Sequence, residues 1–355
     1  MRSSTDQADA PARPGRPRYT RQRSGPLRFL APLLAVLVLL VLITESLALG
    51  SRTLSPEEVW QGLLAYDNSV ASKVVWGLRI HRTILAIVVG ASLAVAGVVM
   101  QALTRNPLAE PGILGVNAGA SLAVVAAIGG LGLTSVNQYL PFAFAGAAAA
   151  AVLVHVMARR SADAGPARLV LAGVALGASL SSITGTMTMY NSKAFDSYRF
   201  WVVGSLENRK LEVLLWVAPF LAVGLVLALA SAHSLNALAL GDEQATALGV
   251  NLAVVRGGAF VAITLLCGAA TAAAGPISFI GLVIPHVVRL LVGADQRRLL
   301  AWSVAAGAGL LLAADVAGRL LVRPAELEAG IVTAFIGAPV LLVLALTNRT
   351  VRRSA

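Results

Sequence analysis

Long apolar stretches, separated by short polar segments, run along almost the whole chain. Residues 111–158 contain no Asp, Glu, Lys or Arg, and neither do residues 257–288. Most of the stretches are apolar on all sides rather than along one stripe, which is typical of helices surrounded by lipid. Because an apolar helix of about 20 residues crosses the hydrocarbon core of a bilayer, the pattern predicts an all-α polytopic membrane protein rather than a soluble domain.

Polar breaks divide these stretches into ten predicted transmembrane helices. Residues 111–158 are too many for one crossing and are split at 135–138, and the stretch after Arg256 is split at Gly275-Pro276. A short surface helix is expected between the first two crossings, from a capping box at Ser55 to about residue 66. The crossings are expected near residues 30–50, 83–103, 115–133, 139–157, 169–189, 211–231, 257–274, 277–292, 301–321 and 331–346.

Composition supports the same class of protein and defines two regions. Of the 355 residues, 57% are hydrophobic and 13% are charged, whereas a soluble domain has roughly 25% charged residues. Residues 1–27 are rich in Arg, Pro, Ser and Ala, and we expect them to form a disordered basic tail in the cytoplasm. Residues 28–355 are expected to form a single transmembrane domain.

The distribution of basic residues predicts the orientation in the membrane. Ten crossings place both termini on one side, where the segments hold 18 of the 28 Lys and Arg residues, and the opposite segments hold 10. Basic residues concentrate in cytoplasmic segments, so we expect both termini inside the cell, in the plasma (inner) membrane. The net charge of +11 then reflects topology, and we do not expect nucleic acid as a partner.

The sequence gives no pattern typical of catalysis or metal binding. Its four histidines lack the spacing of metal ligands, and it has a single cysteine, Cys267. It shows no carboxylate pair, no nucleophile beside a base and no GxxxxGK[ST] phosphate loop. We therefore expect no metal site, no cofactor and no enzymatic activity of its own.

Three polar groups at helix ends are the candidate functional sites. The first is a turn that two prolines would force, or a plain cytoplasmic connection. The second is a glycine-bracketed segment in the longest inner loop, with Ala245 and Leu248 on one face; it fits a helix that docks in a partner's groove, or a solvated loop helix. The third is a set of outer arginines. They form an exposed docking site for an acidic partner, or they snorkel to the membrane surface or form a local ion pair of Arg319 with Asp315. The groups are Arg105, Asn106, Pro107, Glu110 and Pro111; Leu240, Gly241, Asp242, Ala245, Leu248 and Gly249; and Arg79, Arg82 and Arg319.

Placed among ten crossings, these groups resemble the permease subunits of ABC importers for ferric siderophores, haem and vitamin B12, the FecCD type. The resemblance runs from about residue 30 to the C-terminus. It includes VGASLAVAGVVMQAL at 89–103, LAGVALG at 171–177, GPISFIGLVIPHVVRL at 275–290 and TAFIGAPV at 333–340. The chain departs from the family with His81 where Pro is common, with Asp295-Gln296-Arg297 for Asp-His-Arg, and with Glu326-Leu327-Glu328 for Glu-Leu-Pro.

The resemblance implies a set of partners and roles. Two permeases, identical or different, would surround a translocation path, with two cytoplasmic ATPases below and a substrate-binding protein outside. The segment Leu240–Gly249 would rest in a cleft of the ATPase, and the outer arginines would pair with acidic residues of the binding protein. The fifth crossing would line the path, with the loop before Arg168 near the inner gate.

The cargo follows from family frequency and not from residues. Ferric siderophore is the first choice, and haem or vitamin B12 is the alternative. An ion-coupled secondary transporter would need carboxylates or broken helices near the membrane midplane. Only Asp315 comes close to this, and Arg319 can neutralise it.

Overall fold

The computed structural model describes residues 27–50, 53–64, 69–159 and 166–353. The basic tail and the loop before Arg168 lie outside these residues, apart from the last one of the tail. Within the described residues, ten apolar helices, seven long and three shorter, lie where hydropathy places the crossings, so the prediction of an all-α protein with about ten membrane helices is confirmed. They are α1 Leu27–Ala48, α4 Ile80–Thr104, α5 Val116–Leu131, α6 Val136–Arg159, α7 Pro166–Tyr190, α9 Leu211–Leu238, α11 Leu252–Ala274, α12 Ile280–Val292, α13 Gln296–Leu321 and α14 Ala329–Arg353.

Seven of the described helices are long and apolar enough to cross a membrane, and three further apolar helices are shorter. The shorter ones are 116–131, 280–292 and 329–344. The second crossing is longer than expected, because α3 Val70–Val74 and η1 Val75–Arg79 continue directly into α4. The remaining short elements are α2 Pro56–Leu64, η2 Pro111–Leu114, α8 Ser192–Val202 and α10 Asp242–Ala247.

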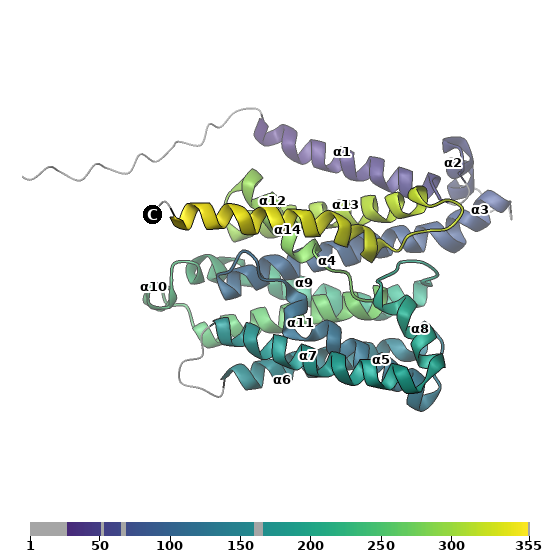
Figure 1. Cartoon of the computed structure of the whole chain (residues 1–355). Helices are drawn as coiled ribbons and strands as arrows, with labels where there is room; N and C mark the ends of the chain where they lie inside the picture. Colours follow the sequence, from purple (N-terminus) through teal and green to yellow (C-terminus); the bar gives the residue numbers. More distant parts are fainter. Residues whose placement is uncertain (1–26, 51–52, 65–68, 160–165, 354–355) are drawn as a thin grey trace, which may run out of the picture.

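The long helices run side by side, and the short ones gather at the two ends of the bundle (Figure 1). Helix α10 and the end of α14 lie at one end, toward which α1 also begins, and α2, α3 and α8 lie at the other. This arrangement fits an even number of crossings. That the end with α10 faces the cytoplasm remains a prediction.

Helix α4 forms the centre of the bundle, and small residues allow its neighbours to approach it. In its most apolar window 78% of the residues are buried, against 6% in α1, which runs along the outside (Figure 1). A Cβ atom on Gly97 would lie 2.0 Å from the carbonyl oxygen of Gly281 in α12, and one on Gly90 would lie 2.4 Å from that of Gly307 in α13. Such contacts between small residues let helix backbones pack closely in lipid.

The predicted helix breaks have local causes. Helix α11 ends at Ala274 because Gly275 adopts φ 77°, and Pro276 follows. The next helix, α12, begins only at Ile280, so it has 13 residues and a length of about 20 Å. The crossing expected over 277–292 is therefore too long at its start, because the helix begins at Ile280. At this length α12 is shorter than the roughly 30 Å hydrocarbon core.

The capping box of α2 is confirmed atom by atom. The backbone N–H of Ser55 donates to Glu58 Oε2 at 2.7 Å, and the N–H of Glu58 donates to Ser55 Oγ at 3.2 Å. The helix is described from Pro56 to Leu64, and its expected end near residue 66 falls among residues 65–68, outside the described chain.

Candidate functional sites

The glycine-bracketed segment forms the short helix that the sequence predicts. Gly241, with φ 117°, precedes α10, and Gly249, with φ 80°, follows it. Ala245 is fully buried against the bundle, whereas Leu248 is 65% exposed. The two residues expected on one face of the segment therefore differ in exposure, since Ala245 packs inward and Leu248 is open. Leu240 and Leu248 are the exposed large apolar side chains of this segment.

Asp242, the first residue of α10, pairs with two arginines from two long helices. Its Oδ1 accepts a hydrogen bond from Nη2 of Arg105, which ends α4, and its Oδ2 accepts one from Nη2 of Arg256 in α11 at 2.6 Å. Arg105 also donates through Nε to the carbonyl of Leu238, at the end of α9, at 2.9 Å. Sequence separation hides this cluster, since Arg105 and Asp242 lie 137 positions apart.

The charge state of Asp242 follows from these partners. Partial burial would raise the pKa of its carboxyl group, but the hydrogen bonds and positive charges of Arg256 and Arg105 outweigh that effect. The pKa of Asp242 is therefore lower than the ordinary value for aspartate, and the group is ionised at neutral pH.

The two-proline turn follows the end of α4 that lies near α10, and it contributes to the buried structure. Arg105 adopts the left-handed conformation with φ 50°, and Asn106 Oδ1 accepts from the N–H of Leu108 at 3.0 Å. Pro111 is buried and begins η2. The carboxylate of Glu110, which is partly buried, accepts a hydrogen bond from the N–H of Phe279 at 2.7 Å and so ties this turn to the start of α12. Pro107 is exposed in this turn.

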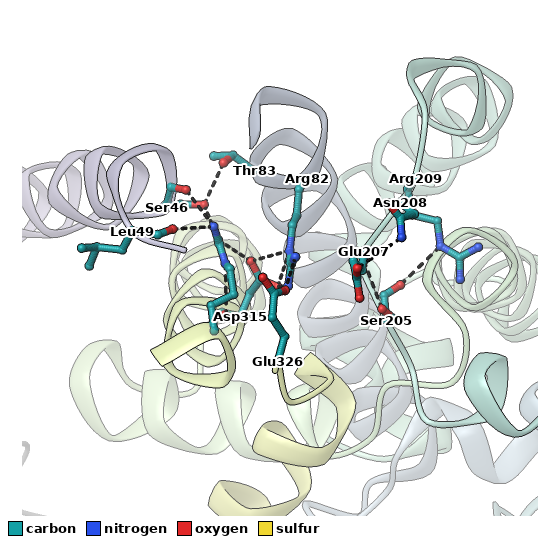
Figure 2. A network of polar contacts seen from close by, with 11 residues as sticks. Ser46, Leu49, Arg82, Thr83, Ser205, Glu207, Asn208, Arg209, Asp315 and Glu326 are labelled. Carbon is teal, nitrogen blue, oxygen red and sulfur yellow. Dashed lines mark hydrogen bonds and ion pairs between the residues drawn. The ribbon is translucent and has the colours of Figure 1, made fainter. Parts of the chain in front are cut away.

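Arg82 lies inside a charge network at the opposite end of the bundle (Figure 2). Its Nη2 lies 2.8 Å from Oδ1 of Asp315 in α13, and its Nη1 lies 2.7 Å from Oε2 of Glu326 in the loop before α14. Asp315 is completely buried. Figure 2 shows Asp315 and Glu326 approaching Arg82 from the same side.

Arg319 and Arg79 are also held by groups within the chain. Arg319 pairs with Asp315 at 2.5 Å and donates to the carbonyl oxygens of Ser46 and Leu49, each at 2.9 Å. Arg79 donates to the carbonyl oxygens at the end of α1, at residues 47 and 48. Ser46 Oγ accepts from Arg319 as well and bonds to the hydroxyl of Thr83.

These contacts show how exposed the outer arginines are, while their docking role stays a prediction. The predicted Asp315–Arg319 ion pair is present, but the expectation of an exposed basic site is wrong, since Arg319 is 2% and Arg79 is 6% exposed. The sequence did not show that Arg79 and Arg319 bind the carbonyl oxygens at the end of α1, or that Arg82 pairs with Glu326. Glu326 matches the first residue of the family's Glu-Leu-Pro, and no sequence pattern indicates its contact with Arg82, which lies 244 positions away.

A second polar group flanks the network at the same end (Figure 2). In the loop after α8, the N–H of Glu207 donates to Ser205 Oγ at 3.0 Å, and Arg209 donates to the carbonyl of Ser205 at 3.4 Å. The N–H of Ser205 donates to the carbonyl of Ala274 at 2.7 Å, which ties this loop to the end of α11. Across the described ranges, no three His, Cys, Asp or Glu side chains come together as metal ligands.

Comparisons with known proteins agree with the arrangement of the helices and loops. A family model described as the FecCD transport family matches residues 37–347. The ferric enterobactin transport system permease protein FepD of Escherichia coli strain K12 is 44% identical over 312 residues, which are 87% of this chain and 93% of FepD. The hemin transport system permease protein HmuU of Yersinia pestis is 37% identical over 326 residues, which are 89% of this chain and 95% of HmuU.

A solved structure shares the fold. It is described as an inward-facing conformation of a metal-chelate type ABC transporter, and it is 30% identical with a TM-score of 0.78, covering 89% of this chain and 98% of that one. The matched family model spans nearly all of the helical bundle, including α10 and the outer charge network. The chain therefore belongs to the FecCD transport family, and it is a multi-pass membrane permease subunit of an ABC importer rather than an enzyme.

Proposed function

We propose that this permease carries ferric siderophores. The observation that carries the proposal is the identity to FepD, a ferric enterobactin permease, which at 44% exceeds the 37% identity to the hemin permease HmuU. Haem is an alternative cargo, supported by the similarity to HmuU. Vitamin B12 is a second alternative, because the FecCD type includes vitamin B12 importers.

The proposed assembly has two permeases, two cytoplasmic ATPases and one external binding protein. The termini and α10 face the cytoplasm, where the exposed Leu240 and Leu248 contact the ATPase. Helix α7 faces the second permease, identical or different, and the translocation path. This placement is supported by the exposure of α7, of which only 17% of the most apolar window is buried, with Leu171 and Val174 open.

The binding protein is proposed to dock at the end that carries α2, α3 and α8 (Figure 1). Arg79, Arg82 and Arg319 would support this face from beneath, because their guanidinium groups are occupied within the chain. Exposed charges, such as Arg199 in α8, are the groups that can meet an acidic partner without breaking buried ion pairs.

The test is purification of the tagged permease with its associated subunits, followed by uptake measurements in proteoliposomes. We expect an ATPase and a binding protein to co-purify, and radiolabelled ferric enterobactin to accumulate only with ATP inside, even when an ion gradient is held constant. Accumulation of hemin or cyanocobalamin instead would overturn the cargo. Uptake by the permease alone would overturn the proposed assembly.

A further inference from the structure

Helix α10 has six residues and depends on the surrounding bundle for its position. Isolated helices of this length are unstable in water. It follows α9 and precedes α11 in the chain, and it packs on both. The buried Ala245 fixes one of its faces, and the N–H of Val250 donates to the carbonyl of Ala245 at 3.0 Å.

The central helix α4 is remote from α10 in sequence, and a charge cluster connects the two. Arg105, at the end of α4, bonds to the carboxylate of Asp242 and to the carbonyl of Leu238. Arg256 of α11 holds the other carboxylate oxygen of Asp242. One carboxylate at the start of α10 is therefore shared between α4 and α11, and the end of α9 is joined to the same guanidinium group.

Movement at Asp242 has a direct route into the core. Helix α4 packs against α9, α11, α12 and α13. The close approach of Gly97 to Gly281 leaves no room for α4 to slide past α12 without displacing it. A displacement of α10 that pulls on Arg105 is therefore passed to a helix that touches most of the bundle.

We propose that Asp242, Arg105 and Arg256 form a latch that transmits the movement of α10 to α4 and α11, with all three acting as positioning residues. The inference rests on the proposed function, in which the ATPase moves α10. The partial exposure of the three side chains, 42% for Asp242 and 35% for each arginine, suits a contact that strains or re-forms during a cycle. Ion pairs at this exposure contribute little to stability, so their loss affects transmission more than folding.

Two other roles for Asp242 predict different results. If it touches the ATPase directly, its removal weakens the binding of that subunit. If it serves only as a negative charge at the amino end of α10, its removal acts independently of Arg105. A double-mutant cycle separates shared from independent action, because substitutions that break one contact do not add.

The experiment uses the whole transporter in proteoliposomes, with radiolabelled ferric enterobactin as the probe. The variants are R105Q, R256Q, D242N, the R105Q/D242N double variant, and R298Q as a matched control. Arg298 lies at the start of α13 and is not part of the cluster. The readouts are uptake per ATP hydrolysed, stimulation of ATP hydrolysis by the binding protein, retention of the ATPase, and melting temperature.

For D242N we expect uptake per ATP to fall at least about 5-fold, the lower end of the usual range for coupled sites, with ATPase retention and melting temperature unchanged. R105Q and R256Q should each lower uptake per ATP, and R298Q should leave it unchanged. Uptake per ATP in the double variant should be no lower than in D242N. Multiplying effects of R105Q and D242N, or normal coupling in R105Q, would overturn the latch. Loss of the ATPase from D242N would overturn it in favour of direct contact.

Failure of the proposed function gives a different result. A cysteine placed at Leu248 should crosslink to the ATPase if α10 is the coupling helix. If the crosslink is absent, the coupling assignment fails, whatever the variants do. If ferric enterobactin is not carried, the double-mutant cycle can still be measured through the stimulation of ATP hydrolysis by the binding protein. The latch is then tested independently of the cargo.

Discussion

Replacing Asp315 with asparagine should destabilise the permease strongly, because it leaves two buried arginines without their shared anion. Asp315 is fully buried and contacts Arg82 at 2.8 Å and Arg319 at 2.5 Å. Breaking a buried ion pair by removing one partner costs about 3–5 kcal/mol. Arg82 keeps Glu326 at 2.7 Å, so most of the loss comes from Arg319, and we expect about 3 kcal/mol.

The measurement is the free energy of unfolding of the purified permease in mixed micelles, followed by circular dichroism as the denaturing detergent is increased. D196N is the matched control, since Asp196 pairs with Arg199 on the exposed surface of α8 at 3.4 Å. Exposed pairs of this kind contribute about 0–1 kcal/mol. R319Q should cost less than D315N, because Asp315 then keeps Arg82. A loss from D315N no larger than that from D196N would refute the buried network.

Three further predictions concern packing, reactivity and pH. G97A should destabilise the chain by about 1–3 kcal/mol in the same assay, since the added Cβ meets the carbonyl oxygen of Gly281 at 2.0 Å, whereas G130A, with nothing within 4 Å, should not. Cys267 is 2% exposed, so a water-soluble maleimide should label it, as read by mass spectrometry, only after denaturation. Because the pKa of Asp242 is lowered in the folded state, its ionised carboxylate contributes to stability above the ordinary carboxyl pKa range. This contribution is lost only as the pH falls through the lowered pKa. The difference in unfolding free energy between the parent and D242N should therefore stay constant from about pH 8 to about pH 5.

Hydropathy alone predicts the helices well because lipid imposes a simple rule on them. Every backbone polar group must be satisfied within the segment, and apolar runs of sufficient length become helices. The break predicted at Gly275 is confirmed, whereas the break predicted at 135–138 lies at 132–135, because Gly132 with φ 69° ends α5 and α6 already begins at Val136. Helix α8 was missed because it is amphipathic and short. Its signal was Asn191, whose side chain accepts from the N–H of Ala194 as an amino-terminal cap.

The candidate sites were predicted less completely, because their chemistry depends on partners distant in sequence. The outer arginines are identifiable as a group, but Arg82 meets Asp315 across 233 positions and Glu326 across 244. Spacing along one helix shows only the Arg319–Asp315 pair. In the same way, α10 can be located from its glycines, whereas the inward face of Ala245 and the pairing of Asp242 with Arg105 depend on how α4, α9 and α11 pack.

The asparagine variant of Asp315 also tests which arginines meet the binding protein. If Arg79, Arg82 and Arg319 left their internal partners on docking, removal of Asp315 would release Arg319 and tighten binding. If they stay in place, D315N lowers stability without tightening binding, and R199Q on exposed α8 weakens binding more at low salt than at high salt, because exposed charges are screened. We expect the second result, since an arginine that left Asp315 would give up a buried ion pair for one at a solvated interface, where such pairs contribute less.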